Sequence, residues 1–238
     1  MIRRWWWAPI AWAWGAAALG ANDGPTDALD VWAGQTLTIA PGPTGLRLWL
    51  DLHERRTPSA FTAIVRPGVG WQATPWLSLW AGYAWVPTDA DDGPTVHEHR
   101  AWEQVILQHK VDPVSLQLRL RQEQRVRHGQ PGVSHRLRAL ARSNIAISGP
   151  VGVALWDEMF VGFNDPGWLG YVGFDQNRAF VGPYLEGPRG VRWELGYMNQ
   201  AIPRRDGLQV HHVVAVNLFF SWGPAPKPPP AERGGGTG

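Results

Sequence analysis

The chain has 238 residues, no cysteine, 16 tryptophans and a formal net charge of +2 at neutral pH. The lack of cysteine excludes disulfide bonds and thiolate metal sites. Lysine occurs only at Lys110 and Lys227, so nearly all the positive charge is arginine. No run of basic residues is long enough to predict binding to nucleic acid.

The first 21 residues have the order of an export signal. Arg3 and Arg4 form a basic start, residues 5–19 are apolar, and the small residues Gly20 and Ala21 precede a polar, turn-prone segment. We therefore expect residues 1–21 to be a signal peptide, with a membrane anchor as the alternative. After residue 21 no uncharged apolar run reaches the roughly 18 residues of a membrane-spanning helix, so a mature chain in a membrane would have to cross it with strands.

Hydrophobic residues recur with a period of two along the rest of the chain, which indicates strands. In residues 46–53, for example, leucines alternate with Arg47, Trp49, Asp51 and His53. No segment shows a convincing helical period. The sequence predicts eleven strands, at residues 31–40, 45–56, 61–73, 76–86, 97–111, 114–127, 134–148, 151–162, 173–186, 190–200 and 208–222.

Turn-forming residues separate these segments, and short connections alternate with longer ones. The short connections are expected at Pro41 to Pro43, Thr74-Pro75, Asp112-Pro113, Gly149-Pro150 and Gly187-Pro188. The longer ones are expected at residues 56–60, 87–95, 128–132, 164–170 and 202–207. Bacterial outer-membrane barrels alternate short periplasmic turns with longer extracellular loops in this way.

The predicted fold is all-β: a closed antiparallel up-and-down transmembrane β-barrel formed by residues 22–222. Most segments are longer than the ~5–6 residues of ordinary globular strands, and ~9–11 residues suffice to cross a membrane. Because bacterial single-chain barrels usually have an even number of strands, twelve are favoured, with one more in residues 22–30, and ten are the alternative. Residues 223–238 are rich in proline and glycine and are expected to be disordered.

Aromatic residues near the segment ends support a membrane location over the alternative, a soluble barrel or β-sandwich. Tryptophan and tyrosine gather at the two interfaces of a membrane. The residues expected in such a girdle are Trp32, Trp71, Trp76, Trp85, Tyr171, Tyr184, Tyr197 and Trp222.

Several segments resemble a bacterial family known as domain of unknown function family 2490. The resemblance is carried by Trp156 to Phe160, Phe174 to Arg178, Glu194 to Gln200, His212 to Val214, and Trp32 at the start of the first strand. It is most specific over residues 155–200 and covers most of the mature chain. The resemblance implies an outer-membrane β-barrel and adds no reaction.

The charged residues on the strand faces opposite the leucines and valines are predicted to form a polar network in the barrel lumen. Its members are Glu98, Arg119, Arg121, Glu123, Arg125, Arg136, Arg138, Arg142, Glu158 and Arg178. Facing arginines repel each other, so they require carboxylates or an anionic solute. Two interpretations stay open: an anion-attracting channel wall, or a salt-bridged plug in a narrow barrel. Glu158 and Arg178 are expected to pair.

No catalytic motif is present. Ser134 and His135 are adjacent on a strand and point to opposite faces, and no nucleophile elbow occurs. His97 and His99 share a face near the acidic residues 89–92, but solvated loop acids are the simpler interpretation, so no metal and no cofactor are predicted.

The predicted function is that of an exported outer-membrane barrel, either a passive, porin-like channel or a structural envelope protein, and not an enzyme. A membrane-embedded lipid hydrolase and a soluble periplasmic β-sandwich binding protein are the alternatives. Expected partners are outer-membrane lipid, lipopolysaccharide and the outer-membrane assembly machinery, with no nucleic acid. The sequence does not fix the solute or the oligomeric state.

Overall fold

The computed structural model describes residues 29–170, 172–204 and 207–223. They form eleven strands and one short 3-10 turn, η1 (Pro188–Gly190). The strands are β1 (Leu29–Ile39), β2 (Leu46–Thr57), β3 (Ala60–Thr74), β4 (Leu77–Ala90), β5 (Val96–Val111), β6 (Val114–Arg127), β7 (Ser134–Ser148), β8 (Val151–Gly162), β9 (Gly173–Glu186), β10 (Val191–Arg204) and β11 (Gly207–Trp222). Across these described ranges, no helix is long and apolar enough to cross a membrane.

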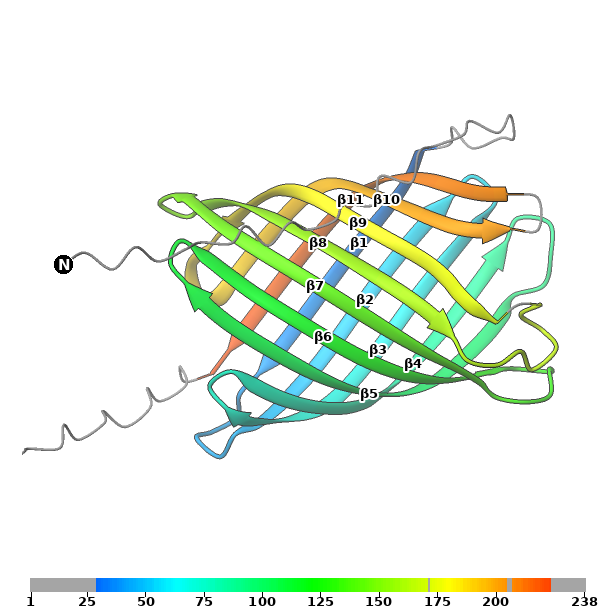
Figure 1. The fold of residues 1–238 in the computed structure, drawn as a ribbon, viewed down its shortest axis with the longest axis horizontal. Helices are drawn as coiled ribbons and strands as arrows, with labels where there is room; N and C mark the ends of the chain where they lie inside the picture. Colours follow the sequence, from blue (N-terminus) through cyan, green and yellow to red (C-terminus); the bar gives the residue numbers. More distant parts are fainter. Residues whose placement is uncertain (1–28, 171, 205–206, 224–238) are drawn as a thin grey trace, which may run out of the picture.

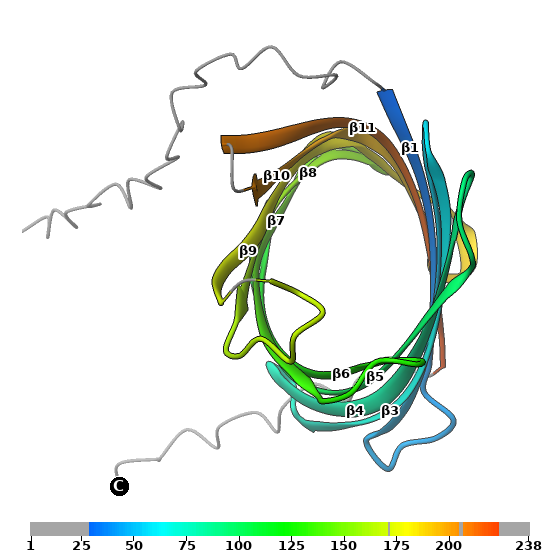
Figure 2. The same cartoon turned by 90° about the vertical axis from the view of Figure 1, so that its right-hand side faces the viewer.

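The strands form one closed barrel in which each pairs with its neighbours in the sequence (Figure 1). Ten consecutive pairs are antiparallel. The closing pair is parallel, from Leu29 opposite His212 to Ile39 opposite Trp222. Viewed along its axis, the barrel is a ring with an oval outline (Figure 2).

The strand number corrects the sequence-based expectation. The eleven segments read from the alternation are the eleven strands of the described barrel, and the preference for twelve, or for ten, is not confirmed. The even-number rule assumes that every pair is antiparallel. A parallel closing pair removes that requirement, so the barrel is not antiparallel throughout. The predicted signal peptide (1–21), the segment before Leu29 and the predicted tail after Gly223 lie outside the described residues.

The connections gather at two ends of the barrel. The turn end carries residues 40–45, 75–76, 112–113, 149–150 and 187–190. The loop end carries residues 58–59, 91–95, 128–133 and the connections from β8 to β9 and from β10 to β11. The described connections lie where the sequence predicted them. The predicted length alternation holds only in part, because the loop-end connection at 58–59 is shorter than the turn-end connection at 40–45.

Polarity is inverted relative to a soluble protein. On β6, Leu118 and Leu120 are 52% and 54% exposed, whereas Arg121 and Glu123, at the next positions of the other face, are 0% and 1% exposed. Because neighbouring strand residues point to opposite faces, the strand places its leucines outside and its arginines and glutamate in the lumen. A soluble protein buries the former and exposes the latter.

The residues predicted to form an aromatic girdle differ in exposure. Five of its members are exposed: Trp71, Trp76, Trp85, Tyr197 and Trp222. Trp32 and Tyr184 are only 8% and 7% exposed and belong to a buried cluster, so their assignment to the girdle was wrong. Both lie at inward positions, because the face of a strand residue depends on register and not on its distance from the strand end. Tyr171 lies outside the described residues.

Candidate functional site

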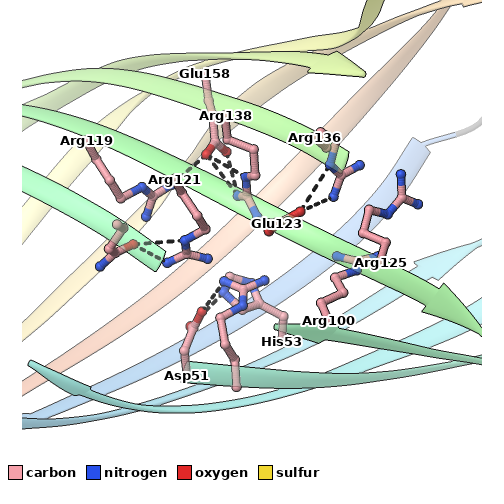
Figure 3. Close-up of polar contacts among 12 residues, drawn as sticks. Asp51, His53, Arg100, Arg119, Arg121, Glu123, Arg125, Arg136, Arg138 and Glu158 are labelled. Atoms are coloured by element: carbon pink, nitrogen blue, oxygen red, sulfur yellow. Dashed lines mark hydrogen bonds and ion pairs between the residues drawn. The ribbon is translucent and has the colours of Figure 1, made fainter. Parts of the chain in front are cut away.

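All ten residues predicted for the lumen network point into the barrel. Eight are buried, and Arg119 and Arg142 are partly buried. They come from five consecutive strands, β5 to β9. Figure 3 shows their side chains converging from β6, β7 and β8, with Asp51 and His53 of β2 facing them.

The centre of this group is a chain of ion pairs formed by Arg119, Glu123, Arg136, Arg138 and Glu158, here called the ion-pair network. Glu123 accepts hydrogen bonds from Arg136 Nη2 at 2.5 Å and from Arg138 Nη1 at 2.8 Å. Glu158 accepts from Arg138 Nε and Nη2 at 3.0 and 2.9 Å, and from Arg119 Nη2 at 2.6 Å. Arg138 therefore joins the two carboxylates.

The ion-pair network offsets the repulsion between facing arginines that the sequence predicts. Arg121 of β6 lies directly opposite Arg138 of β7, and Glu123 lies opposite Arg136. Isolated buried charges cost several kcal/mol each, on the order of the stability of a whole domain when summed. Two bidentate or bridging carboxylates among three guanidinium groups offset that cost by charge-assisted hydrogen bonds.

Further ion pairs lie on the same inner face, and sequence reasoning missed most of their members. Glu98 binds Arg100 at 2.6 Å and Arg125 at 2.7 Å. On β2 and β3, Asp51 binds Arg66 at 2.6 Å. Asp51 could have been found from the alternation with leucine on its strand. Arg66 could not, because valine, proline and glycine interrupt the pattern around it.

Two arginine side chains reach across the lumen. Arg142 of β7 donates a hydrogen bond to Glu194 of β10, and its guanidinium lies 5.4 Å from the ring centre of Phe219 on β11. Arg178 of β9 lies 4.8 Å from the ring centre of Trp32 on β1. Strands β7 and β11, and β9 and β1, are not neighbours in the barrel, so these side chains reach over the interior.

Aromatic rings fill much of the remaining interior. Trp102, Phe160 and Phe180 are each 1% exposed, and Trp80 is 7% exposed. Glycines of the wall lie against three of these rings: Gly68 against Trp102, Gly70 against Trp80 and Gly196 against Phe180. A Cβ at Gly68 would lie 2.6 Å from the Trp102 ring. Such contacts are too short for carbon atoms, so the wall is shaped to admit the rings.

Arg178 does not pair as predicted. It lies directly opposite Glu158 in the β8–β9 register, but Glu158 binds Arg119 and Arg138 instead. Arg178 donates to the neutral Gln176 at 3.1 Å, and its buried Nε has no partner. Arg55 also contacts Trp32, 4.1 Å from the ring centre, and its Nε is also buried without a partner. We call Arg55, Trp32 and Arg178 the arginine stack.

The arginine stack borders a cavity of about 250 Å³ in the half of the barrel nearest the loop end. Seven arginines and one carboxylate, Asp175, line it. Arg204, which is exposed at the end of β10, is one of the seven, so the cavity extends to the rim of the barrel.

Two histidine–carboxylate pairs also lie on the inner face, but neither is joined to a nucleophile by the described contacts. His53 Nε2 lies 2.7 Å from Asp51, and His211 Nδ1 lies 3.0 Å from Asp30. Thr36 donates its hydroxyl to Asp51 and not to the imidazole. Ser134 is fully buried, whereas His135 is exposed. In the ranges that the structure covers, no group of three His, Cys, Asp or Glu residues could hold a metal ion.

Comparison with known proteins identifies a family. The chain matches the family described as "Protein of unknown function (DUF2490)" over residues 29–211, from the first residue of β1 into β11. An uncharacterized protein of Methylorubrum extorquens is 34% identical over 166 residues, which cover 67% of this chain and 72% of that protein. No solved structure matches. The chain therefore belongs to the DUF2490 family of proteins of unknown function.

Proposed function

We propose that this protein is an outer-membrane β-barrel with a filled lumen, and that its role is structural rather than that of an open channel. The membrane part of the proposal is supported by the apolar outer surface. Exposed leucines and valines occur around the barrel, including Leu48, Leu107, Leu118, Val181 and Leu195. Contiguous exposed apolar surface of this extent fits contact with lipid and not with water.

Outward polar residues mark where the lipid contact ends. Glu103 binds Gln124, and Asp157 binds Asn177, on the outer face near the middle of strands β5 and β8. A charge on the lipid face is costly near the membrane midplane and cheap near the interface. We therefore place the membrane around the half nearest the turn end, with the loop end outside the cell, because short turns face the periplasm in bacterial barrels. Outer-membrane lipid and lipopolysaccharide would contact the outer face, and insertion would require the assembly machinery.

The single observation that carries the structural role is the pair of contacts across the lumen, from Arg142 to Glu194 and Phe219, and from Arg178 to Trp32. The ion-pair network lies between them, and its carboxylates Glu123 and Glu158 are buried, which supports a filled barrel centre with a cavity near the loop end. Small closed barrels are filled by side chains in this way, whereas porins of 16 or more strands leave an aqueous channel.

Planar-bilayer recording tests the proposal. Refolded protein, with its insertion checked by protease resistance in the same lipid, should produce no steady current over a range of voltages. Regular conductance steps would contradict a filled lumen. Recovery of the native protein in the soluble periplasmic fraction would contradict the membrane location itself and favour a soluble barrel.

A passive anion channel is the second candidate, favoured by the surplus of arginine in the lumen. Its signature would be anion-selective conductance that falls in Arg121→Gln, since Arg121 is fully buried on the inner face and binds only the neutral Gln104 by hydrogen bonds. A lipid hydrolase has weaker support, because neither histidine–carboxylate pair contacts a hydroxyl nucleophile through its ring in the described contacts.

A further inference from the structure

The cavity near the loop end has more positive charge than its own carboxylates can balance. The seven arginines that line it, together with Arg119, are served by four carboxylates, Glu98, Glu123, Glu158 and Asp175. Arg100 and Arg125 share Glu98, and Arg136 and Arg138 share Glu123. Arg55 and Arg178 bind no carboxylate among the described residues.

The uncompensated charge is held at a fixed place. Arg178 is 6% exposed, and its contacts are Gln176, the ring of Trp32 and, at 4.6 Å, the ring of Phe160. Arg55 lies 4.1 Å from the centre of the same Trp32 ring. Ring faces hold a guanidinium by its flat side, so they leave its N–H groups directed along its edge. In both arginines a buried Nε–H lacks an acceptor.

A buried donor without a partner costs roughly 1–3 kcal/mol, and more when it is charged. Two such arginines against one ring also repel each other. An anion in the cavity would offset the repulsion, because it supplies negative charge, and it would accept hydrogen bonds from the N–H groups of Arg55 and Arg178 that line the cavity. Planar guanidinium groups match the oxygens of phosphate and carboxylate in pairs.

We propose that this cavity binds a small oxyanion of the phosphate class, held by Arg55 and Arg178. At about 250 Å³ the cavity is below the roughly 300–1,000 Å³ of sites for drug-sized ligands, which favours a single charged group over a nucleotide or a lipid. The site faces the lumen and reaches the rim through Arg204, whereas lipid contacts the outer face. The ligand is therefore a soluble anion and not a lipid headgroup. The inference adds a ligand to the proposed barrel but does not depend on whether the lumen conducts.

Calorimetric titration of the full refolded chain with inorganic phosphate, at constant ionic strength in detergent micelles, tests this directly. We expect saturable binding that chloride does not reproduce, and a rise of the unfolding temperature with phosphate. The double variant Arg55→Gln/Arg178→Gln should lose the saturable binding. The control Arg192→Gln, which removes an arginine paired with Glu186 at the turn end, should keep it.

Phosphate stabilises many proteins without binding to a site. This general rise of the unfolding temperature should also occur in the double variant, so only the difference between the two proteins reports the site. No saturable heat in the parent protein, or equal binding in the double variant, would overturn the proposal. If the double variant does not fold, the titration of the parent protein still tests the proposal, because the absence of saturable heat there would overturn it. Tighter binding of lipopolysaccharide than of phosphate, lost in the same variant, would show that the anion belongs to a lipid and overturn the soluble source. Bilayer recording tests the filled lumen and does not depend on phosphate binding. Failure of the anion site can therefore be distinguished from failure of the filled lumen.

Discussion

The ion-pair network and the arginine stack lie on the same inner face, yet their charges are balanced in different ways. In the network, Arg138 binds both Glu123 and Glu158. In the stack, Arg178 contacts two aromatic rings and an amide, and Arg55 contacts Trp32. Buried arginine therefore has two roles in this barrel. In the network it joins carboxylates of different strands. In the stack it borders the cavity with positive charge that no described carboxylate binds.

Replacing one arginine in each region by the same residue should separate these roles most strongly. Arg138→Gln leaves Glu123 and Glu158 short of a shared partner, and breaking a buried pair costs about 3–5 kcal/mol. Arg178→Gln removes no carboxylate partner. It loses two cation–π contacts but relieves a buried repulsion, so we expect a change within about 1 kcal/mol in phosphate-free buffer. Denaturant unfolding in micelles measures both.

Equal destabilisation of the two variants would contradict the distinction. Glu54→Gln, at an exposed position on the outer face of β2, is a suitable control. It should change stability by less than about 0.5 kcal/mol.

The packing of the rings gives a prediction of intermediate size. At Gly68, a Cβ would lie 2.6 and 2.7 Å from atoms of the Trp102 ring. In a filled lumen the ring cannot turn away, so Gly68→Ala should destabilise the barrel by about 1–3 kcal/mol, the usual cost of overpacking. Gly42→Ala is the matched control, because a Cβ there meets nothing within 4 Å. No cost at Gly68 would indicate that Trp102 has free space in the lumen.

The smallest expected effect concerns the β8–β9 loop, which adjoins the arginine-rich cavity. Backbone N–H groups of Gly167, Gly170 and Leu169 donate to the Asp165 carboxylate and hold its pKa below its ordinary value. The loop places Trp168 over Arg127, with 4.5 Å from the guanidinium to the ring centre. Because the folded pKa is depressed, this contribution is present above the unfolded pKa of about 3.9 and is lost as the pH falls through the folded value.

Asp165→Asn should therefore speed hydrogen exchange at the Gly167 and Gly170 amides at neutral pH and leave amides of β6 and β7 unchanged. Asp92→Asn, in the exposed β4–β5 loop, controls for the loss of a loop charge. If exchange in β6 and β7 rises with that of the loop, the loop and the ion-pair network are one unit and the comparison between the regions fails.

The strands were predictable because alternation is a local property of the sequence. Leu116, Leu118 and Leu120 set the outer face of β6, and the register of the hairpin then placed Arg121 and Arg138 opposite each other. The closing pair was not predictable. The partner of β1 is at the other end of the chain, and no local pattern states whether Leu29 meets His212 in parallel or antiparallel.

The members of the lumen site could be read from face parity, but their partners could not. Glu158 and Arg178 are opposite in register and still do not pair, because the Glu158 carboxylate binds Arg119 and Arg138 instead. Long side chains in a narrow lumen choose among several strands, so register alone does not fix their contacts. Trp32 shows the same limit: its place near a strand start suggested an interfacial residue, but it points into the lumen, where two arginines contact its ring.

Thiol labelling measures most directly whether the lumen is filled, and the absence of native cysteine makes the background clean. Ser78→Cys and Ser134→Cys place a thiol at inner positions that are 4% and 0% exposed, and Ser59→Cys places one in an exposed connection. With a membrane-impermeant maleimide, the account predicts that Ser59→Cys reacts rapidly while the two inner thiols react only after unfolding. Inner thiols that react as fast as the one at position 59 in the folded barrel would show an open, water-filled lumen and contradict the account.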